Sequence, residues 1–250
     1  GGIAVHDLGV ADAYVKGDIQ VGVLAGEIAS GKIERVFSSG KVVGGSFQIG
    51  GLVGITEGGI SNSYSKASVT VTNNNQSIGG FVGRISGYGV KIFNSYSTGK
   101  ITDGSQNNAS GFVGEMLQQV EIISGSFWDT TSSEKATSTT TTNANPLGKT
   151  TTQMQTIEGD GTSIYTDAGW DFAGDSSDGV DEAWLMADGE YPRLAWEDKD
   201  TLTADELHLD GLGTSFSPFQ INSAEDLITI SQNSEYWDKH FIQTADIVFD

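Results

Sequence analysis

A glycine-flanked apolar block recurs four times in the first half of this 250-residue sequence, and no other feature constrains the fold as strongly. The glycines that close successive blocks stand 28, 29 and 31 residues apart, at Gly26, Gly54, Gly83 and Gly114. A fixed period of about 30 residues is typical of repeat proteins, in which each unit stacks on its neighbour. The sequence therefore predicts a stack of similar units instead of one compact core.

An apolar residue and an aromatic residue follow each block, always four positions apart. The four pairs are Ile33 and Phe37, Ile60 and Tyr64, Ile92 and Tyr96, and Ile123 and Phe127. In three units a β-branched residue follows the aromatic by five positions, at Val42, Val69 and Ile101. The distance from the block to the isoleucine, in contrast, varies from 6 to 9 residues. Strands of fixed length joined by turns of variable length predict a β-solenoid, because successive turns must pair at a spacing of about 4.8 Å.

The spacing predicts two inward ladders of side chains in this solenoid. One ladder comprises Leu24, Leu52, Phe81 and Phe112, and the other comprises Tyr14, Phe37, Tyr64, Tyr96 and Phe127. An earlier partial unit obeys the same spacing with Val10, Tyr14 and Ile19. Residues 1–130 are thus predicted to form about five turns of a right-handed β-solenoid. An exposed aromatic platform for stacking sugars is the alternative interpretation of the second ladder.

Composition agrees with an all-β chain. The sequence has 34 glycines and only 3 prolines, which favours many tight turns between short strands. Helical repeats are disfavoured because each glycine inside a helix costs roughly 1 kcal/mol. Propeller blades are disfavoured because each needs about 40 residues. The sequence has no cysteine, which excludes disulfides and thiolate metal sites.

Charge is distributed unevenly along the chain. Residues 1–156 carry 11 acidic and 10 basic residues, whereas residues 157–250 carry 22 acidic and 3 basic, which gives net charges of −1 and −19. Such an acidic second half argues against nucleic acid and anionic lipid as partners. No run of about 18 apolar residues is present, so a membrane span is not expected.

The repeats resemble a known family. The units read GGLVG at 50–54 followed by ISNSYS at 60–65, and GGFVG at 79–83 followed by IFNSYSTG at 92–99. They are similar to the GLUG repeat of large bacterial surface and secreted proteins, including adhesins and extracellular peptidases. The first unit departs from the pattern with VFS at 36–38, and the last ends in SFW at 126–128. The resemblance covers residues 1–130 and implies a protein at the cell surface or outside the cell.

Four further segments follow the repeats. Residues 131–152 are predicted to form an exposed Ser/Thr-rich loop, since 10 of the 13 residues from Thr130 to Thr142 are Ser or Thr. Residues 153–197 are acidic and rich in aromatics, and they resemble the segment that closes such repeat blocks by covering the open last turn. Residues 198–212 are a charged linker. In residues 213–250, Ser223 is placed to cap a short helix with Asp226 in its first turn, before further strands, as at the start of a new repeat block.

Candidate sites are few. Asp175, Asp178 and Asp181 crowd one Gly-flanked loop and could chelate calcium, although their spacing does not match an EF-hand. Asn75 and Asn108 fit the N-glycosylation pattern in predicted outward turns. Glu27 and Glu115 follow the blocks, but no ladder of carboxylates forms, so we expect solvated turn residues instead of catalytic acids. The histidines, at His6, His208 and His240, lack the spacing of metal ligands.

The sequence therefore predicts a non-enzymatic structural or adhesive protein, extracellular or on the cell surface, that requires no cofactor. Segment 213–250 is expected to cover the open first turn of another repeat block or another copy by strand addition, which would build a head-to-tail fibre. Cell-surface glycans or proteins are the other expected partners. The alternative function is that of a β-helix that binds or degrades polysaccharide.

Overall fold

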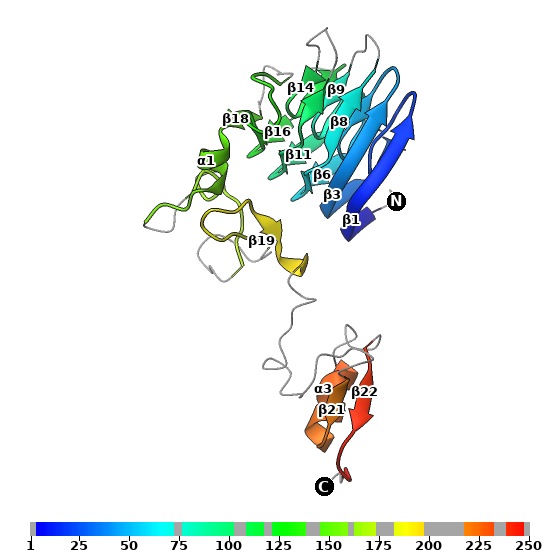
Figure 1. The fold of residues 1–250 in the computed structure, drawn as a ribbon, viewed down its shortest axis with the longest axis vertical. Helices are drawn as coiled ribbons and strands as arrows, with labels where there is room; N and C mark the ends of the chain where they lie inside the picture. Colours follow the sequence, from blue (N-terminus) through cyan, green and yellow to red (C-terminus); the bar gives the residue numbers. More distant parts are fainter. Residues whose placement is uncertain are drawn as a thin grey trace. The chain divides into compact units, whose positions relative to one another are not determined.

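The computed structural model describes residues 4–72, 77–102, 109–117, 122–138, 146–159, 163–173, 183–197, 218–232 and 239–247. The chain divides into two compact units, Gly1–Ala195 and Trp196–Asp250. The first unit contains a β-solenoid, which confirms the predicted fold class, but it has about four turns where about five were predicted. Successive turns lie side by side from β1 to β16 (Figure 1).

Three parallel sheets form the sides of the solenoid. The largest contains β1 (Ala4–Gly17), β3 (Lys32–Gly44), β6 (Gly59–Ser61), β7 (Tyr64–Ser65), β8 (Ser68–Val71), β11 (Lys91–Phe93), β12 (Tyr96–Ser97), β13 (Ile101–Thr102), β16 (Ile122–Ser124), β17 (Phe127–Asp129) and β18 (Leu147–Lys149). The second contains β2 (Ala25–Ile28), β5 (Val53–Thr56), β10 (Val82–Ile85) and β15 (Val113–Met116). The third contains β4 (Ile49–Gly50), β9 (Ile78–Gly79) and β14 (Ala109–Ser110).

The first predicted ladder is confirmed. The Phe81 and Phe112 rings stack with centroids 4.8 Å apart, and Leu52 in the preceding turn is fully buried. The backbone amide of Leu52 donates to Phe81 and that of Phe81 donates to Phe112, so the three residues occupy equivalent positions. These side chains pack with a column of buried isoleucines at the centre of the solenoid, namely Ile33, Ile60, Ile92 and Ile123.

One corner of every turn is made by a residue in the left-handed backbone region. Strand register aligns these residues in one column, with φ between 46° and 56°, at Asp7, Arg35, Asn62, Asn94 and Gly125. Asparagine, aspartate and glycine tolerate this conformation best because a short polar side chain or none relieves the clash with the backbone. The asparagine of the repeated Asn-Ser-Tyr-Ser sequence is therefore the residue that turns the chain.

The aromatic ladder is present, but it faces outward instead of inward. Phe37, Tyr64 and Tyr96 stack with centroids 5.2 and 4.9 Å apart. The serines that follow them point into the solenoid, where Ser38 and Ser97 donate to the carbonyls of Gly51 and Gly111 across the interior. Side chains alternate along a strand, so the preceding aromatics lie on the opposite face. The prediction of a second inward ladder is wrong because the small serine, and not the ring, occupies the inner position.

The predicted register of the first turn is also wrong. Val5 pairs with Ile33 and Gly9 with Phe37, whereas Tyr14 lies opposite Lys41. Tyr14 and Ile19 are 68% and 53% exposed and belong to no ladder. A bulge between Val10 and Ala13 shifts the register. In the first turn, Gly9 occupies the position that the aromatic residue has in the later turns. A Cβ at Gly9 would lie 2.3 Å from the Phe37 ring. The first turn therefore lacks the aromatic residue that marks the later units.

The beginning of the Ser/Thr-rich segment is part of the stack. Ser133 and Ser138 are buried, against the expectation of an exposed loop. The Ile101 amide donates to the Ser133 carbonyl, and the Ser138 hydroxyl accepts from the Val113 amide. The polar side chains are tolerated because they provide the hydrogen bonds that another turn would have provided. After this segment, β18 extends the largest sheet by pairing with β17.

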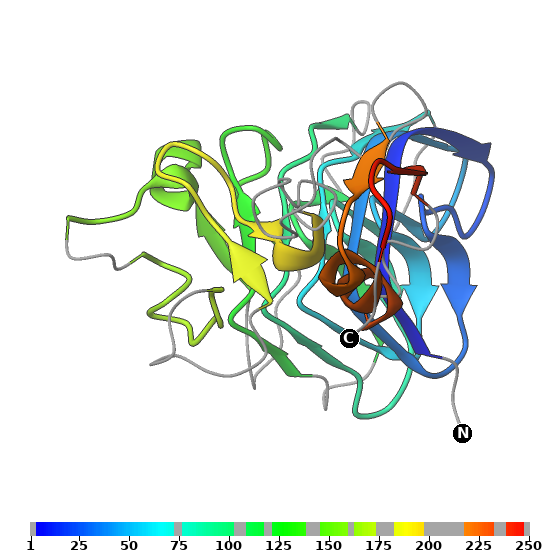
Figure 2. The ribbon, with the colours of Figure 1, turned by 90° about the horizontal axis from the view of Figure 1, so that it is seen from below.

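A covering segment, which comprises residues 163–173 and 183–195, packs on the outward aromatic ladder. It contains Tyr165, Trp170 and Trp184, all fully buried, and the hairpin of β19 (Trp184–Leu185) and β20 (Arg193–Leu194). It is preceded by the short helix α1 (Thr151–Gln155), which Thr150 caps. Predicted as a cap on the last turn, the segment instead lies along the side of several turns, and in Figure 2 its yellow strands run beside the green turns.

The second unit contains β21 (Phe219–Ile221), α3 (Ala224–Gln232) and β22 (Phe241–Gln243), and the two strands are parallel. The predicted helix cap is confirmed, because the Ser223 hydroxyl accepts from the Asp226 amide at 3.1 Å. The Asp226 carboxylate accepts in return from the amides of Asn222 and Ser223. The predicted linker, 198–212, lies outside the described residues.

Candidate functional site

The first turn presents an unpaired strand edge. β1 is a 14-residue strand that pairs with β3 on one side, and no strand lies on its other side among the residues that the structure describes. Its free N–H and C=O groups form a template on which another parallel strand can pair. This edge is the first element of the candidate site.

An apolar hollow of about 320 Å³ lies beside this edge. It is lined by inward side chains of the first turn, Val5, Leu8, Leu24 and Ile28, together with Ile33 from the next turn. Ile33 is buried, whereas Val5, Leu24 and Ile28 are only partly buried and pack against the core from one side. The first turn therefore exposes the interior of the solenoid to an incoming segment.

Exposed large hydrophobic residues concentrate in the same turn. Leu8 is 40% exposed, and Tyr14 and Ile19 are more than half exposed. Apolar patches beside a free strand edge mark interaction surfaces or aggregation hazards. The exposed edge and the apolar hollow together can bury a complementary strand and its side chains.

A charged pair lies at the corner of this turn. Arg35 Nε donates to Asp7 Oδ1 at 2.7 Å, and Arg35 Nη2 donates to Asp7 Oδ2 at 3.1 Å. These hydrogen bonds from Arg35 lower the pKa of Asp7, against the smaller opposing effect of burial. The pair holds two successive left-handed corners in register, since Asp7 and Arg35 occupy equivalent positions.

At the other end of the solenoid, the last turn contains a buried carboxylate, that of Asp129. Asp129 is fully buried and accepts from the amides of Thr131 and Ser132, from the Thr151 hydroxyl at 2.6 Å and from the Tyr191 hydroxyl. Burial alone would raise the pKa of Asp129, but these four hydrogen bonds outweigh it and lower the pKa. The carboxylate thus ties the last turn to α1 and to the covering segment.

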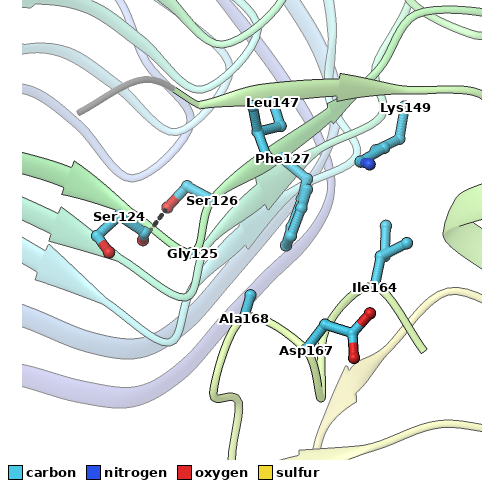
Figure 3. Close-up of a pocket in the computed structure, with 9 residues that line it drawn as sticks. All are labelled: Ser124, Gly125, Ser126, Phe127, Leu147, Lys149, Ile164, Asp167 and Ala168. Atoms are coloured by element: carbon cyan, nitrogen blue, oxygen red, sulfur yellow. Dashed lines mark hydrogen bonds between the residues drawn. The ribbon is translucent and has the colours of Figure 1, made fainter. Parts of the chain in front are cut away.

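A second hollow of about 340 Å³ lies between the last turn and the covering segment. Figure 3 shows Phe127 projecting between β18 and the loop that carries Ile164, Asp167 and Ala168. Its charged lining residues are Lys149 and Asp167, which come from different segments. Phe127 is 2% exposed, so the hollow offers little aromatic surface to a ligand. Inverting or retaining glycoside hydrolysis would need a pair of carboxyl groups, and Asp167 is the single one here.

The stacked geometry agrees with a comparison to known protein families. The model of the GLUG motif matches residues 45–72, which run from the end of β3 through β4 to β8. The chain contains a GLUG repeat. The same strand register continues through the following turn. No curated protein and no solved structure matches the chain.

The ligand sites predicted from the sequence fall in parts of the chain that the structure does not describe. Asp175, Asp178 and Asp181 lie outside the described residues, as do Asn75 and Asn108. Within the described ranges, no group of three or more His, Cys, Asp or Glu is arranged to hold a metal. Likewise, no described helix is long and apolar enough to cross a membrane.

The two glutamates that follow the blocks lie on strands, Glu27 on β2 and Glu115 on β15, and not on turns as predicted. Glu115 accepts from Arg84 Nε at 2.9 Å and from the Ser77 hydroxyl. Burial alone would raise the pKa of Glu115, but the hydrogen bonds from Ser77 and Arg84 outweigh this effect and lower the pKa. Glu27 accepts from Gln20 Nε2 at 3.3 Å. Glu27 and Glu115 therefore have different hydrogen-bond partners and do not form a pair with each other.

Sequence reasoning missed the residues that line the open end, Val5 and Leu8, and the buried Asp129. The available signal for Val5 was its place 28 residues before Ile33, which equals the spacing of Gly26 and Gly54. Asp129 has no counterpart in the other repeats, so the repeat pattern contained no signal for it.

Proposed function

We propose that this chain is an extracellular structural or adhesive repeat protein whose first turn receives a further strand from a partner chain or repeat block. The observation that carries the proposal is the combination at β1 of a free strand edge and an apolar hollow of about 320 Å³. A bare edge of this length would promote uncontrolled association unless a specific partner covered it.

The second unit offers segments of the required kind. β21 and β22 are short parallel strands with apolar side chains, and the Phe219 and Phe241 rings lie 5.8 Å apart. A parallel strand is what β1 needs, because every pair in the solenoid is parallel. We propose that segment 213–250 of one copy, or of one repeat block, pairs with the first turn of the next.

Such a contact joins two different surfaces and does not close on itself, so it generates a fibre. An adhesive role follows from the same architecture, since a fibre presents many copies of one surface to cell-surface glycans or proteins. The likeness to GLUG repeats of surface proteins supports a location outside the cell.

Deletion of residues 213–250 tests the proposal. The truncated chain should keep the circular dichroism spectrum of the solenoid and lose end-to-end association in light scattering and electron microscopy. Leu8→Lys in the full chain should also abolish association, because it places a charge in the apolar hollow. Tyr88→Lys is the matched control, since Tyr88 is 80% exposed on a turn remote from the first strand. Filaments formed equally by the truncated chain would contradict the proposal.

A further inference from the structure

The second unit forms a single coil around α3. β21 and β22 pair in parallel, with Phe219 opposite Phe241, and the chain passes through α3 between them. Figures 1 and 2 both show α3 beside these strands. A connection between two parallel strands of one sheet is right-handed in about 98% of cases. β22 therefore follows β21 in the same rotational sense in which each solenoid turn follows the one before it.

One face of this two-stranded sheet is covered and the other is open. Phe219 and Ile221 are buried, and the strand register places Phe241 on the same face. Ile242 lies opposite Gln220 on the other face and is 49% exposed. The covered face is the one enclosed by the connection through α3, so it corresponds to the interior of a solenoid turn. The face of Ile242 corresponds to the exterior.

Each of the two strands also has a free edge. The Thr244 amide donates to the Ile221 carbonyl of β21, and the Phe219 amide donates to the carbonyl just before β22. Successive N–H groups of a strand point to opposite sides. The Gln243 amide therefore points to the free edge of β22, and the Gln220 amide points to the free edge of β21. No third strand pairs with either edge among the residues that the structure describes.

Only one of these two free edges matches the first turn of the solenoid. The free edge of β1 is the one that faces a preceding turn, because β3 of the following turn occupies the other. In the same rotational sense, the free edge of β22 faces a following turn and that of β21 faces a preceding one. Parallel strands that keep their inner faces on one side can pair only through edges of opposite kind. β21 could pair with β1 only with α3 turned to the outside, which would leave the apolar hollow uncovered.

We infer that β22 of one copy, and not β21, pairs with β1 of the next copy, with Phe241 facing the hollow lined by Val5 and Leu8. The inference rests on the proposed association of segment 213–250 with the first turn, and it specifies the strand and its orientation. In this orientation β21 and α3 lie beyond β22, so they close the interior of the first turn. Neither β21 nor β22 contains a charged residue, so the pairing of β22 brings no like charges together.

A matched pair of proline variants of the full chain tests which edge is used. Proline is tolerated where the N–H of an edge strand points away from the sheet, and both Gln243→Pro and Gln220→Pro meet this condition. Gln243→Pro removes a donor to β1 and should weaken self-association by about tenfold or more in a sedimentation concentration series. Gln220→Pro should associate as the wild type does. So should Gln243→Ala, which removes the side-chain hydrogen bond to the Ala245 carbonyl but keeps the amide.

Disulfide trapping shows directly which strand lies next to β1, and the chain contains no native cysteine that would interfere. A copy with Ile242→Cys should cross-link to a copy in which an exposed residue beside Val5 is replaced, by Ala4→Cys or His6→Cys. Gln220→Cys is the matched control, because Gln220 lies beside Ile242 on the same face but one strand farther from β1. The Cα atoms of a disulfide lie about 4.4–6.8 Å apart, whereas Gln220 would stand about 9.6 Å from β1.

The outcomes separate this inference from the proposed function. Association that is lost with Gln243→Pro alone, with disulfides formed through position 242, would support pairing by β22. Association that persists with Gln243→Pro, or disulfides formed through position 220, would overturn the inference and leave the proposed association intact. A full chain that stays monomeric at every concentration would overturn both.

Discussion

At the last turn of the solenoid, β18 pairs with β17 and residues 130–138 donate and accept hydrogen bonds in place of another turn. At the first turn, β1 pairs with β3 alone among the described residues, and its apolar side chains line a hollow. Both ends are built from the same repeat, so among the described residues the difference comes from the segment that follows the last repeat. A parallel stack has no intrinsic end, and each end requires a dedicated segment.

The aromatic ladder shows the same contrast along the side of the stack. Tyr64 and Tyr96 are buried beneath Trp184 and Tyr191 of the covering segment, whereas Phe37, nearer the first turn, is only partly buried. Trp184 donates to the Asn62 side chain and Trp170 to the Gly125 carbonyl, so the segment binds the left-handed corners as well as the rings. The later turns are thus covered along one side by side chains that the first turn lacks.

Trp170→Ala should produce the largest loss of stability. Trp170 is fully buried, and its ring centroid lies 4.3 Å from that of Trp184 and 4.7 Å from that of Tyr165. Its Nε1 donates a hydrogen bond to the Gly125 carbonyl. Its truncation should lower the free energy of unfolding by about 3–5 kcal/mol, measured by denaturant titration. Tyr88→Ala, at an 80% exposed residue, should stay within about 0.5 kcal/mol of the wild type. Equal effects of the two substitutions would show that the covering segment is not packed as described.

Asp129→Asn should have an intermediate effect that depends on pH. The folded pKa of Asp129 is lowered, so its contribution is complete above the ordinary value of 3.8 and is lost as pH falls below that value. At neutral pH the variant should be less stable by about 1–3 kcal/mol, because the buried hydrogen-bond donors lose a charged acceptor. Melting temperatures of both proteins between pH 7 and pH 2 should converge in acid. A constant difference across this range would contradict the assigned role of the carboxylate.

A pair of glycine substitutions compares the middle of the stack with its open end. A Cβ at Gly79 would lie 2.1 Å from the Val82 carbonyl oxygen, so backbone must move, and Gly79→Ala should cost about 1–3 kcal/mol. A Cβ at Gly9 meets the Phe37 ring, which is only partly buried and can shift, so Gly9→Ala should cost less than about 1 kcal/mol. Chemical denaturation measures both, and the reverse order would show that the first turn is as tightly packed as the interior.

The sequence was sufficient to predict the stack and its first ladder, because Leu52, Phe81 and Phe112 recur at spacings that the backbone register must respect. It could not show which face the aromatics occupy. Serine and tyrosine alternate at 63–65 and 95–97, and the interior of a turn accepts the small residue because carbonyls such as those of Gly51 and Gly111 satisfy its hydroxyl. That information lies in contacts between turns.

The open end was missed for a different reason. Its register depends on a bulge between Val10 and Ala13, and its ladder position is Gly9, where the aromatic signal is absent. Tyr14 satisfied the spacing by coincidence.

Amide hydrogen exchange of β1 across a protein concentration series tests the central claim most directly. If the first turn receives a strand from another copy, the amides of residues 4–17 should become more protected as concentration rises, together with those of β21 and β22. The amides of β10, in the middle of the stack, should not change, because they already pair within the chain. Exchange of β1 that stays fast at every concentration while the protein associates would contradict strand addition at the first turn.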